Sequence, residues 1–257
     1  IMKKELQIFL TAVMFYTRIP CPRWVDHSQG MLEKATRYFP LVGWIVGGAA
    51  AVSLYGFCQI LPLSVSIVLS MVISILVTGA FHEDGFADVC DGFGGGWTKE
   101  KILVIMKDSR MGAYGAVGIF LLLLLKFFCL QELAQSSITT CCYLLFAAHA
   151  LSRFTAIVLR KNLDYVREND DNKAKPIAKQ TSNKDYFIAG IFGLAPLFLL
   201  QTVWVLFVFI PLFILVLYLR WYFKKWIGGY TGDCLGATQQ IAELFIYLSF
   251  LALWKFI

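Results

Sequence analysis

Charged residues are scarce in this chain. Only 16% of its 257 residues are Asp, Glu, Lys or Arg and 58% are hydrophobic, whereas about 25% of residues are charged in ordinary soluble domains. The segments 41–81, 186–219 and 244–254 carry no charge at all. A membrane-spanning helix needs about 20 apolar residues, so these runs exclude a soluble globular domain. We expect an all-α, polytopic membrane protein with about six to seven transmembrane helices.

Other signatures are missing as well. The seven cysteines show no C-x-x-C spacing and lie mostly inside apolar runs, so we expect neither a zinc site nor a disulfide framework. No internal repeat divides the chain, and we expect one integral-membrane catalytic domain over residues 1–257. The start, "IMKKELQIFLTAVMFYTRIP", lacks a small-x-small cleavage site and is too short for a comfortable span. We expect an interfacial or re-entrant helix there.

The apolar runs also predict where the spans lie. They are expected near 41–61, 63–81, 113–131, 138–159 and 237–255, with Pro62 separating the first two. As a single helix at about 1.5 Å per residue, 186–219 would be about 51 Å long, well beyond a hydrocarbon core of about 30 Å. We therefore expect two short spans in this run, with a turn near Gln201 and Thr202.

Lys and Arg residues are distributed unevenly between the two ends of these spans. With two spans in 186–219, one side collects the segments 18–40, 82–112, 160–185 and 220–236, which hold 18 Lys and Arg, whereas the opposite loops hold none. Cytoplasmic loops carry the excess, so we expect these segments to face the cytoplasm from the cell inner membrane. The net charge of +6 partly reflects this bias and contacts with anionic lipid, so no nucleic-acid partner is expected.

Negative charge is concentrated in "FHEDGFADVCDGFGGG", residues 81–96. Asp84, Asp88 and Asp91 are spaced i, i+4, i+7, so on a helix they project from one face within about 40° of arc. Three like charges on one face repel, and Mg²⁺ held together with substrate phosphates would neutralise them. We expect these three residues to bind Mg²⁺ and to act in catalysis. An acidic helix start explains one or two of these acids but not a third two turns later.

Further candidate residues flank this cluster. Glu83 lies about 100° around the helix and is a weaker ligand candidate, while His82 is a candidate base or a partner for a backbone carbonyl. In "MKDSRMGAYG" (106–115), four consecutive polar residues are assigned to catalysis or substrate binding: Lys107, Asp108, Ser109 and Arg110. Lys and Arg suit phosphate oxygens. The alternative for this segment is a basic membrane anchor.

Two later positions complete the candidate site. Arg153 lies inside a predicted span, four residues after His149, where a charge requires a cavity or a partner; we expect it to contact substrate or a carboxylate. The stretch "GGYTGDCLGA" (228–237) leads into the last span, and a glycine-rich helix start presents free N–H groups to an anion. The residues assigned to substrate binding here are Gly229, Thr231, Gly232 and Asp233. The alternative is a tight turn with an N-cap.

With these motifs in order, the chain resembles the cobalamin synthase family, the adenosylcobinamide-GDP ribazoletransferases. The matching motifs cover essentially the whole chain: "FYTRIPCP" (15–22), "FPLVGWIVG" (39–47), "HEDGFADVCDG" (82–92), "IMKDSRMGAYG" (105–115), "SR" (152–153) and "GGYTGDCLGA" (228–237). Glu83 departs from the pattern, since the family usually has an apolar residue there.

The resemblance implies that α-ribazole, or its 5′-phosphate, attacks adenosylcobinamide-GDP through a ribose hydroxyl. The products are adenosylcobalamin, or its 5′-phosphate, and GMP, in the final nucleotide-loop assembly step of cobalamin biosynthesis. Mg²⁺ is the expected cofactor, and an Asp of the cluster or His82 accepts the hydroxyl proton. The expected partners are these substrates and the lipid bilayer, and homo-oligomerisation is left open.

Two other classes of membrane protein share some of these features. A CDP-alcohol phosphotransferase also sets spaced Asp residues around a metal and a diphosphate, but the Ala-Arg after its first Asp pair and its longer spacing to the second pair are missing here. A membrane transporter would explain His149 and Arg153 within a span, but transport sites lie near the bilayer midplane, whereas these acids lie at the edge of the predicted spans.

Overall fold

The computed structural model describes residues 2–26, 28–161, 163–167 and 182–254. Its elements, in chain order, are α1 (Met2–Tyr16), α2 (Gln29–Ala35), the 3₁₀ helix η1 (Thr36–Tyr38), α3 (Phe39–Phe57), α4 (Leu63–Thr78), α5 (Phe81–Gly95), α6 (Lys99–Ile105), α7 (Ala113–Ser136), α8 (Ile138–Arg160), α9 (Asn183–Leu194), the 3₁₀ helices η3 (Ala195–Leu200) and η4 (Val203–Val208), α10 (Phe209–Ile227) and α11 (Gly232–Trp254). An isolated bridge between Tyr165 and Tyr230 is the one β-type pairing in the described part of the chain. The all-α expectation is confirmed.

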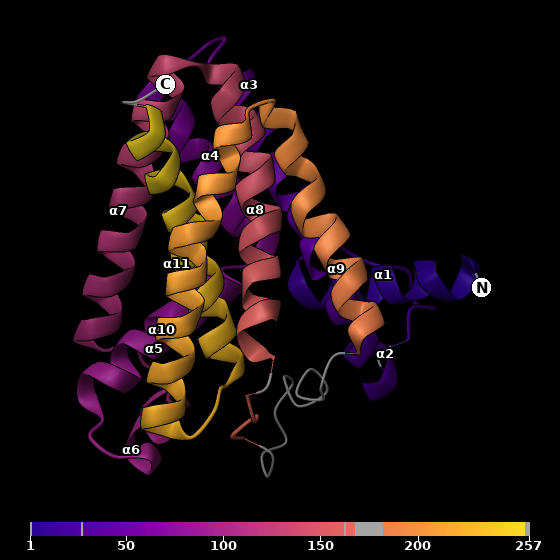
Figure 1. Cartoon of the computed structure of the whole chain (residues 1–257), viewed down its shortest axis with the longest axis vertical. Helices are drawn as coiled ribbons and strands as arrows, with labels where there is room; N and C mark the ends of the chain where they lie inside the picture. Colours follow the sequence, from indigo (N-terminus) through magenta and orange to yellow (C-terminus); the bar gives the residue numbers. More distant parts are fainter. Residues whose placement is uncertain (1, 27, 162, 168–181, 255–257) are drawn as a thin grey trace.

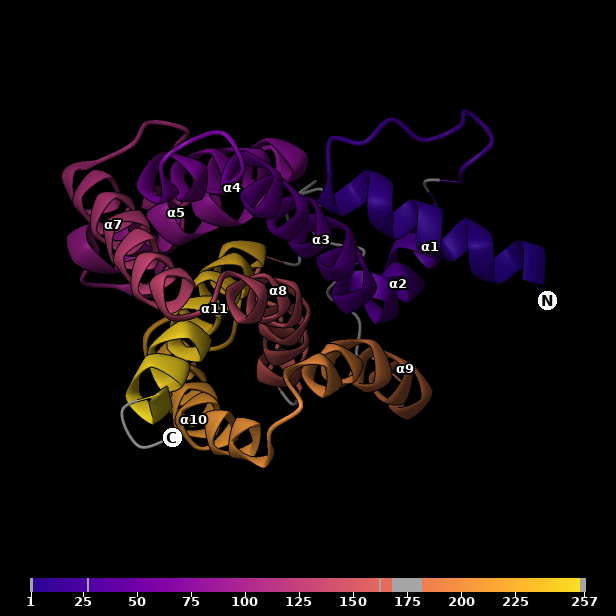
Figure 2. The same ribbon diagram turned by 90° about the horizontal axis from the view of Figure 1, so that it is seen from above.

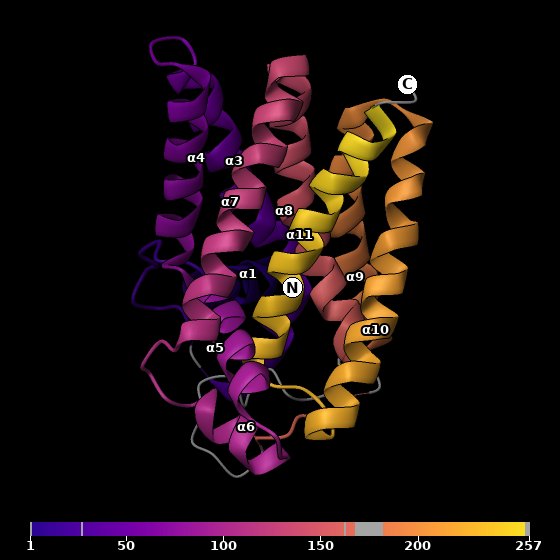
Figure 3. The ribbon, with the colours of Figure 1, turned by 90° about the vertical axis from the view of Figure 1, so that its left-hand side faces the viewer.

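The long helices run side by side along the longest axis of the molecule (Figures 1 and 3). Within the described residues, six helical segments are long and apolar enough to cross a membrane, or seven if the bent pair α4–α5 forms one span. The run 186–219 is divided as expected, because one such segment ends at Leu200 and the next begins at Val203. Gln201 takes a left-handed conformation at this turn, with φ of 49°.

Helix α1 is not part of this bundle. It runs roughly perpendicular to the long helices and carries the N-terminus away from them (Figures 1 and 2). The buried Arg37 ties its start to the bundle, since the guanidinium contacts Glu5 at 2.6 Å and Asp185, in the first turn of α9, at 3.1 Å. This orientation is that of a helix lying along the membrane surface.

Helices α8 and α11 occupy the middle of the bundle, with α3, α4, α5 and α7 on one side and α9 and α10 on the other (Figure 2). Gly43 and Gly47, four residues apart, let α3 approach α8 closely. A side chain on Gly43 would collide with the carbonyl of His149, and one on Gly47 would lie 3.0 Å from the Cα of Phe146. Small residues at this spacing are typical of helix pairs in membranes, where close backbone contact replaces hydrophobic burial.

A sharp bend places α5 at one end of the bundle. Gly79 and Ala80 adopt left-handed conformations, with φ of 66° and 59°, and α5 leaves the axis of α4 by 90°. Helix α5 then packs across the start of α11, where a side chain on Gly85 would lie 3.1 Å from the Cα of Asp233. The carboxylates of α5 therefore lie near the N-terminal ends of α7 and α11.

The orientation of the bundle is a testable expectation. A cysteine substituted for Asn172, in the loop 160–185, would test the expected orientation, but this residue lies outside the described residues. Within the described residues, α6 and the end of α7 lie at opposite ends of the bundle (Figures 1 and 3). We expect a cysteine at the exposed Glu100 to be modified by a membrane-impermeant maleimide only after cells are opened, and one at the exposed Ser136 in intact cells. The parent chain, with its seven cysteines, supplies the background. Labelling of Glu100→Cys in intact cells would reverse the topology.

Candidate active site at one end of the bundle

Carboxylates from two helices gather where α5 crosses the start of α11. Burial, together with the negative charges of Asp233 and Asp84, raises the pKa of Asp88 to about 7. Burial and a nearby like charge both disfavour the charged form of a carboxyl group, and burial is the larger cause here. The arrangement is one that a bound cation would stabilise.

Asp91 has a role that the sequence pattern did not reveal. Its Oδ2 accepts a hydrogen bond from the N–H of Gly112 at 2.7 Å, and its Oδ1 accepts one from the N–H of Gly115 at 2.8 Å. A side chain on either glycine would collide with this carboxylate. Asp91 thus pairs with two backbone donors at the N-terminus of α7, which an anion stabilises.

Whether these acids can bind a metal ion depends on how many of their side chains lie close together. Among the described residues, no three His, Cys, Asp or Glu side chains are grouped closely enough to hold a metal by themselves. Mg²⁺ usually takes only one or two carboxylates and completes its octahedron with water and substrate phosphates. Asp84 and Asp88 fit that requirement. Within the described residues neither carboxylate accepts hydrogen bonds from backbone N–H groups, whereas that of Asp91 does. Metal binding stays a prediction.

Arg167 is a cationic residue of this site that the sequence analysis missed. Its NH1 lies 3.1 Å from Oδ2 of Asp233, its side chain is only 9% exposed, and its NH2 is buried without a hydrogen-bond partner. Backbone hydrogen bonds bind the start of the segment 160–185 to the loop before α11: the N–H of Tyr230 donates to the carbonyl of Asp164 (2.9 Å), and the N–H of Val166 donates to the carbonyl of Tyr230 (3.1 Å). No local pattern signals this pairing of distant segments.

The turn before α11 has structural contacts at two of its predicted substrate-binding residues. Oγ1 of Thr231 accepts a hydrogen bond from the N–H of Cys234 at 3.3 Å, which is an N-cap. Gly229 lies so close to the carbonyl of Asp164 that any side chain would collide with it. Thr231 is therefore the N-cap of α11, as in the alternative given for this stretch. Gly232 begins α11 and lines a cavity described below.

The segment between α6 and α7 presents its polar residues to solvent. Arg110 and Asp108 form a bidentate pair, with NH2 2.6 Å from Oδ2 and Nε 3.0 Å from Oδ1, and the Arg110 side chain is 87% exposed. These hydrogen bonds lower the pKa of Asp108 to about 2. Lys107 and Ser109 are exposed beside them. An exposed pair of this kind contributes little to folding, so Arg110 is available to a substrate.

Arg153 lies inside the bundle rather than at its surface. Its NH1 donates to the carbonyl of His149 at 2.8 Å and lies 3.2 Å from Nδ1 of the same residue, while its guanidinium lies 5.5 Å from the ring centre of Phe39. The side chain therefore has partners and does not snorkel to the interface. Contact with substrate stays a prediction.

Beneath Arg153 lies a buried ionic network that the sequence analysis also missed. Lys126 of α7 pairs with Glu243 of α11, and both are buried. Tyr247 donates to Glu243 at 3.0 Å and Gln239 donates to it at 2.8 Å. Lys126 and Glu243 both fall inside predicted spans, and ionisable residues at that position are the signal that would have found the network.

Two other residues of the acidic stretch face away from the carboxylates. Glu83 accepts a hydrogen bond from Gln240 of α11 at 2.9 Å. His82 stacks on Phe39, with ring centres 5.5 Å apart, and lies about 200° around α5 from Asp84. Burial keeps the pKa of His82 well below 6.5, so its ring is neutral at physiological pH.

These features define a polytopic α-helical membrane protein with a carboxylate-rich site, flanked by arginines, at one end of its bundle. A family model described as cobalamin-5-phosphate synthase matches residues 8–251. The chain belongs to this family.

Several curated relatives carry the same name, adenosylcobinamide-GDP ribazoletransferase. The relative from Leptospira interrogans is 44% identical over 99% of this chain and 98% of its own length. Those from Shewanella frigidimarina and Shewanella amazonensis are 48% and 46% identical, over 97% and 98% of this chain and 95% and 98% of their own lengths. No solved structure matches this chain.

Proposed function

We propose that this chain joins α-ribazole, or its 5′-phosphate, to adenosylcobinamide-GDP with release of GMP, as the names of its relatives indicate for them. The observation that carries the proposal is the group of Asp84, Asp88 and Asp233 facing Arg167. Clustered acids beside a cationic side chain suit a diphosphate bound through a metal. The relatives give no support to a CDP-alcohol phosphotransferase or a transporter.

In this reaction a ribose hydroxyl oxygen forms a bond to the phosphorus attached to cobinamide. The bond from that phosphorus to the GMP oxygen breaks, GMP leaves with the bonding electrons, and the hydroxyl proton passes to a base. A carboxylate of the cluster accepts this proton; in the metal-free protein burial, together with the charges of Asp233 and Asp84, raises the pKa of Asp88 to about 7. His82 remains the second candidate.

The residues around the cluster have separate tasks. Asp84 and Asp88 would hold Mg²⁺, which would neutralise charge at the phosphoryl group. Arg167 has one unpaired, buried NH2 that would donate to a phosphate oxygen. Lys107 and Arg110, both exposed, would approach the diphosphate from the segment before α7. We place this site at the cytoplasmic face of the cell inner membrane.

The direct test uses purified protein in detergent or nanodiscs with adenosylcobinamide-GDP, α-ribazole and Mg²⁺. We expect a new corrinoid product and one GMP per corrinoid formed, with neither product when Mg²⁺ is removed by a chelator. Chromatography with mass detection measures both. Hydrolysis of adenosylcobinamide-GDP that is independent of α-ribazole would contradict the proposal.

Arg110 offers a sharper test of phosphate binding. Arg110→Lys keeps the positive charge but loses the planar fork, so we expect turnover to fall about 10-fold or more at an unchanged melting temperature. Ser109→Ala, an exposed neighbour without charge, is the matched comparison for folding and expression. Normal turnover in Arg110→Lys, with reduced folded yield, would indicate that Arg110 is a membrane anchor and does not bind phosphate.

A further inference from the structure

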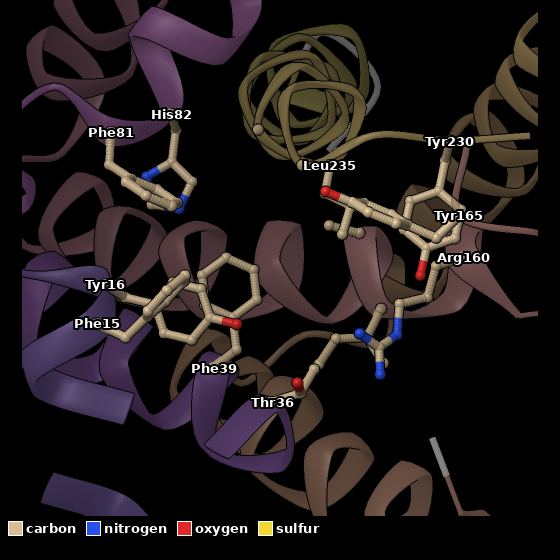
Figure 4. A pocket seen from close by; sticks show the side chains of 14 residues that line it. Phe15, Tyr16, Thr36, Phe39, Phe81, His82, Arg160, Tyr165, Tyr230 and Leu235 are labelled. Carbon is tan, nitrogen blue, oxygen red and sulfur yellow. The ribbon is translucent and has the colours of Figure 1, made fainter. Parts of the chain in front are cut away.

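A cavity lies beside His82, about 200° around α5 from Asp84, and Figure 4 shows side chains that line it. Six aromatic side chains from α1, α3, α5 and the two loops beside α11 dominate its wall: Phe15, Tyr16, Phe39, Phe81, Tyr165 and Tyr230. Pockets for small molecules are lined by apolar and aromatic groups with a few polar ones. The wall of this cavity has that character, with Thr36, His82 and Arg160 as polar members.

Nε2 of His82 and Oγ1 of Thr36 are buried polar atoms of the wall that make no hydrogen bond within the described residues. The ring of His82 stacks on Phe39, which in turn stacks on Tyr16 with ring centres 4.2 Å apart. Leaving a buried polar nitrogen without a hydrogen bond destabilises the folded protein. A ligand with one hydrogen-bonding atom in an otherwise apolar ring would satisfy it.

The cavity adjoins the acidic site through two shared elements. His82 stands two residues before Asp84 on α5, and Gly232 stands next to Asp233 at the start of α11. Gly236, which also lines the cavity, is the point at which α11 passes α5, because a side chain there would lie 3.3 Å from the carbonyl of His82. A molecule in the cavity thus lies beside the crossing that carries the carboxylates.

We infer that this cavity binds the heteroaromatic base of the attacking nucleoside, which places its ribose toward the acidic site. The inference rests on the proposed function. A planar, largely apolar base with one free ring nitrogen matches the aromatic wall and the unpaired His82. A lipid acyl chain would match the wall but leave Nε2 of His82 unsatisfied.

The test fills the cavity from its α8 wall. Two variants, Ile157→Phe in α8 and Leu235→Phe in α11, each put an aromatic ring where the base would bind. We expect KM for α-ribazole to rise at least about 10-fold in each. KM for adenosylcobinamide-GDP should change less than twofold in both. Ile157→Val, which leaves the cavity open, is the matched control. Isothermal titration of the folded proteins with α-ribazole alone gives a second readout that does not depend on turnover.

Each outcome is decisive. If the parent turns over and both filled variants bind α-ribazole as the parent does, the cavity is not the base site, and the proposed function stands without it. If the parent neither binds α-ribazole nor releases GMP, the proposed function fails first. A phospholipid that co-purifies with the parent but not with Ile157→Phe, at unchanged affinity for α-ribazole, would assign the cavity to lipid and overturn the inference.

Discussion

Asp84→Asn and Asp88→Asn should each lower the rate of transfer by about 1,000-fold or more without unfolding the protein. Charge neutralisation at the phosphoryl group is a leading catalytic contribution, and each substitution removes one of the two carboxylates fitted to Mg²⁺. In the absence of Mg²⁺ neither variant should melt below the parent, because each loses a repulsive charge. Added Mg²⁺ with substrate should stabilise the parent more than either variant. The measurements are GMP release and thermal unfolding in detergent.

The same crowding gives this prediction a pH dependence. The pKa of Asp88 is raised in the folded protein to about 7 from an ordinary value of 3.8, so the folded state holds a proton that the unfolded chain has released. Folding stability therefore falls as pH rises between these values, and the loss is complete above the folded pKa. Asp88→Asn should melt above the metal-free parent at pH 8, with a difference that vanishes toward pH 4. A constant difference across this range would show that Asp88 is not crowded.

Asp91 and Glu83 supply contrasting controls. Asp91→Asn keeps one acceptor oxygen for the two N–H groups of Gly112 and Gly115, so it should lower the free energy of unfolding by about 0.5–2 kcal/mol, as lost caps do. Asp88→Asn should not. Glu83→Gln retains an acceptor for Gln240 and should keep most of its activity. Equal behaviour of Asp84, Asp88 and Asp91 variants would favour a three-carboxylate site instead.

Breaking the Lys126–Glu243 pair should have the largest effect on folding. Glu243→Gln leaves Lys126 buried without its counter-charge, and removal of one partner from a buried pair costs about 3–5 kcal/mol. Lys126→Met leaves Glu243 uncompensated in the same way. The double variant removes both charges, so it should be more stable than either single variant. Unfolding in mixed detergent, followed by loss of helical circular dichroism, measures all three.

An exposed ion pair is the matched comparison for this network. Asp108→Asn removes the partner of Arg110 at the surface, where water solvates the remaining charge, so no change in stability is expected. Additive effects of Lys126→Met and Glu243→Gln would show that the two side chains do not interact in the folded protein.

Several parts of the fold follow from local rules and were predicted correctly. The division of 186–219 rests on the thickness of a bilayer, and the structure turns at Gln201, as that argument requires. The helix carrying Asp84, Asp88 and Asp91 is present as α5. The sharp bend at Gly79 and Ala80 was not anticipated, because Ala rarely takes a left-handed conformation and only its surroundings hold it there.

By itself, the sequence determined the membrane class, the number of spans and the stretch in which the acids are concentrated, since each depends on residue type and spacing along one helix. Tertiary structure alone decided which charged residues lie together: Asp91 accepts hydrogen bonds at the N-terminus of α7, and Asp233 and Arg167 lie near Asp88. It also paired Lys126 with Glu243. Charges attract and repel through space, and the helix crossings that set their distances depend on side-chain packing between segments far apart in the chain.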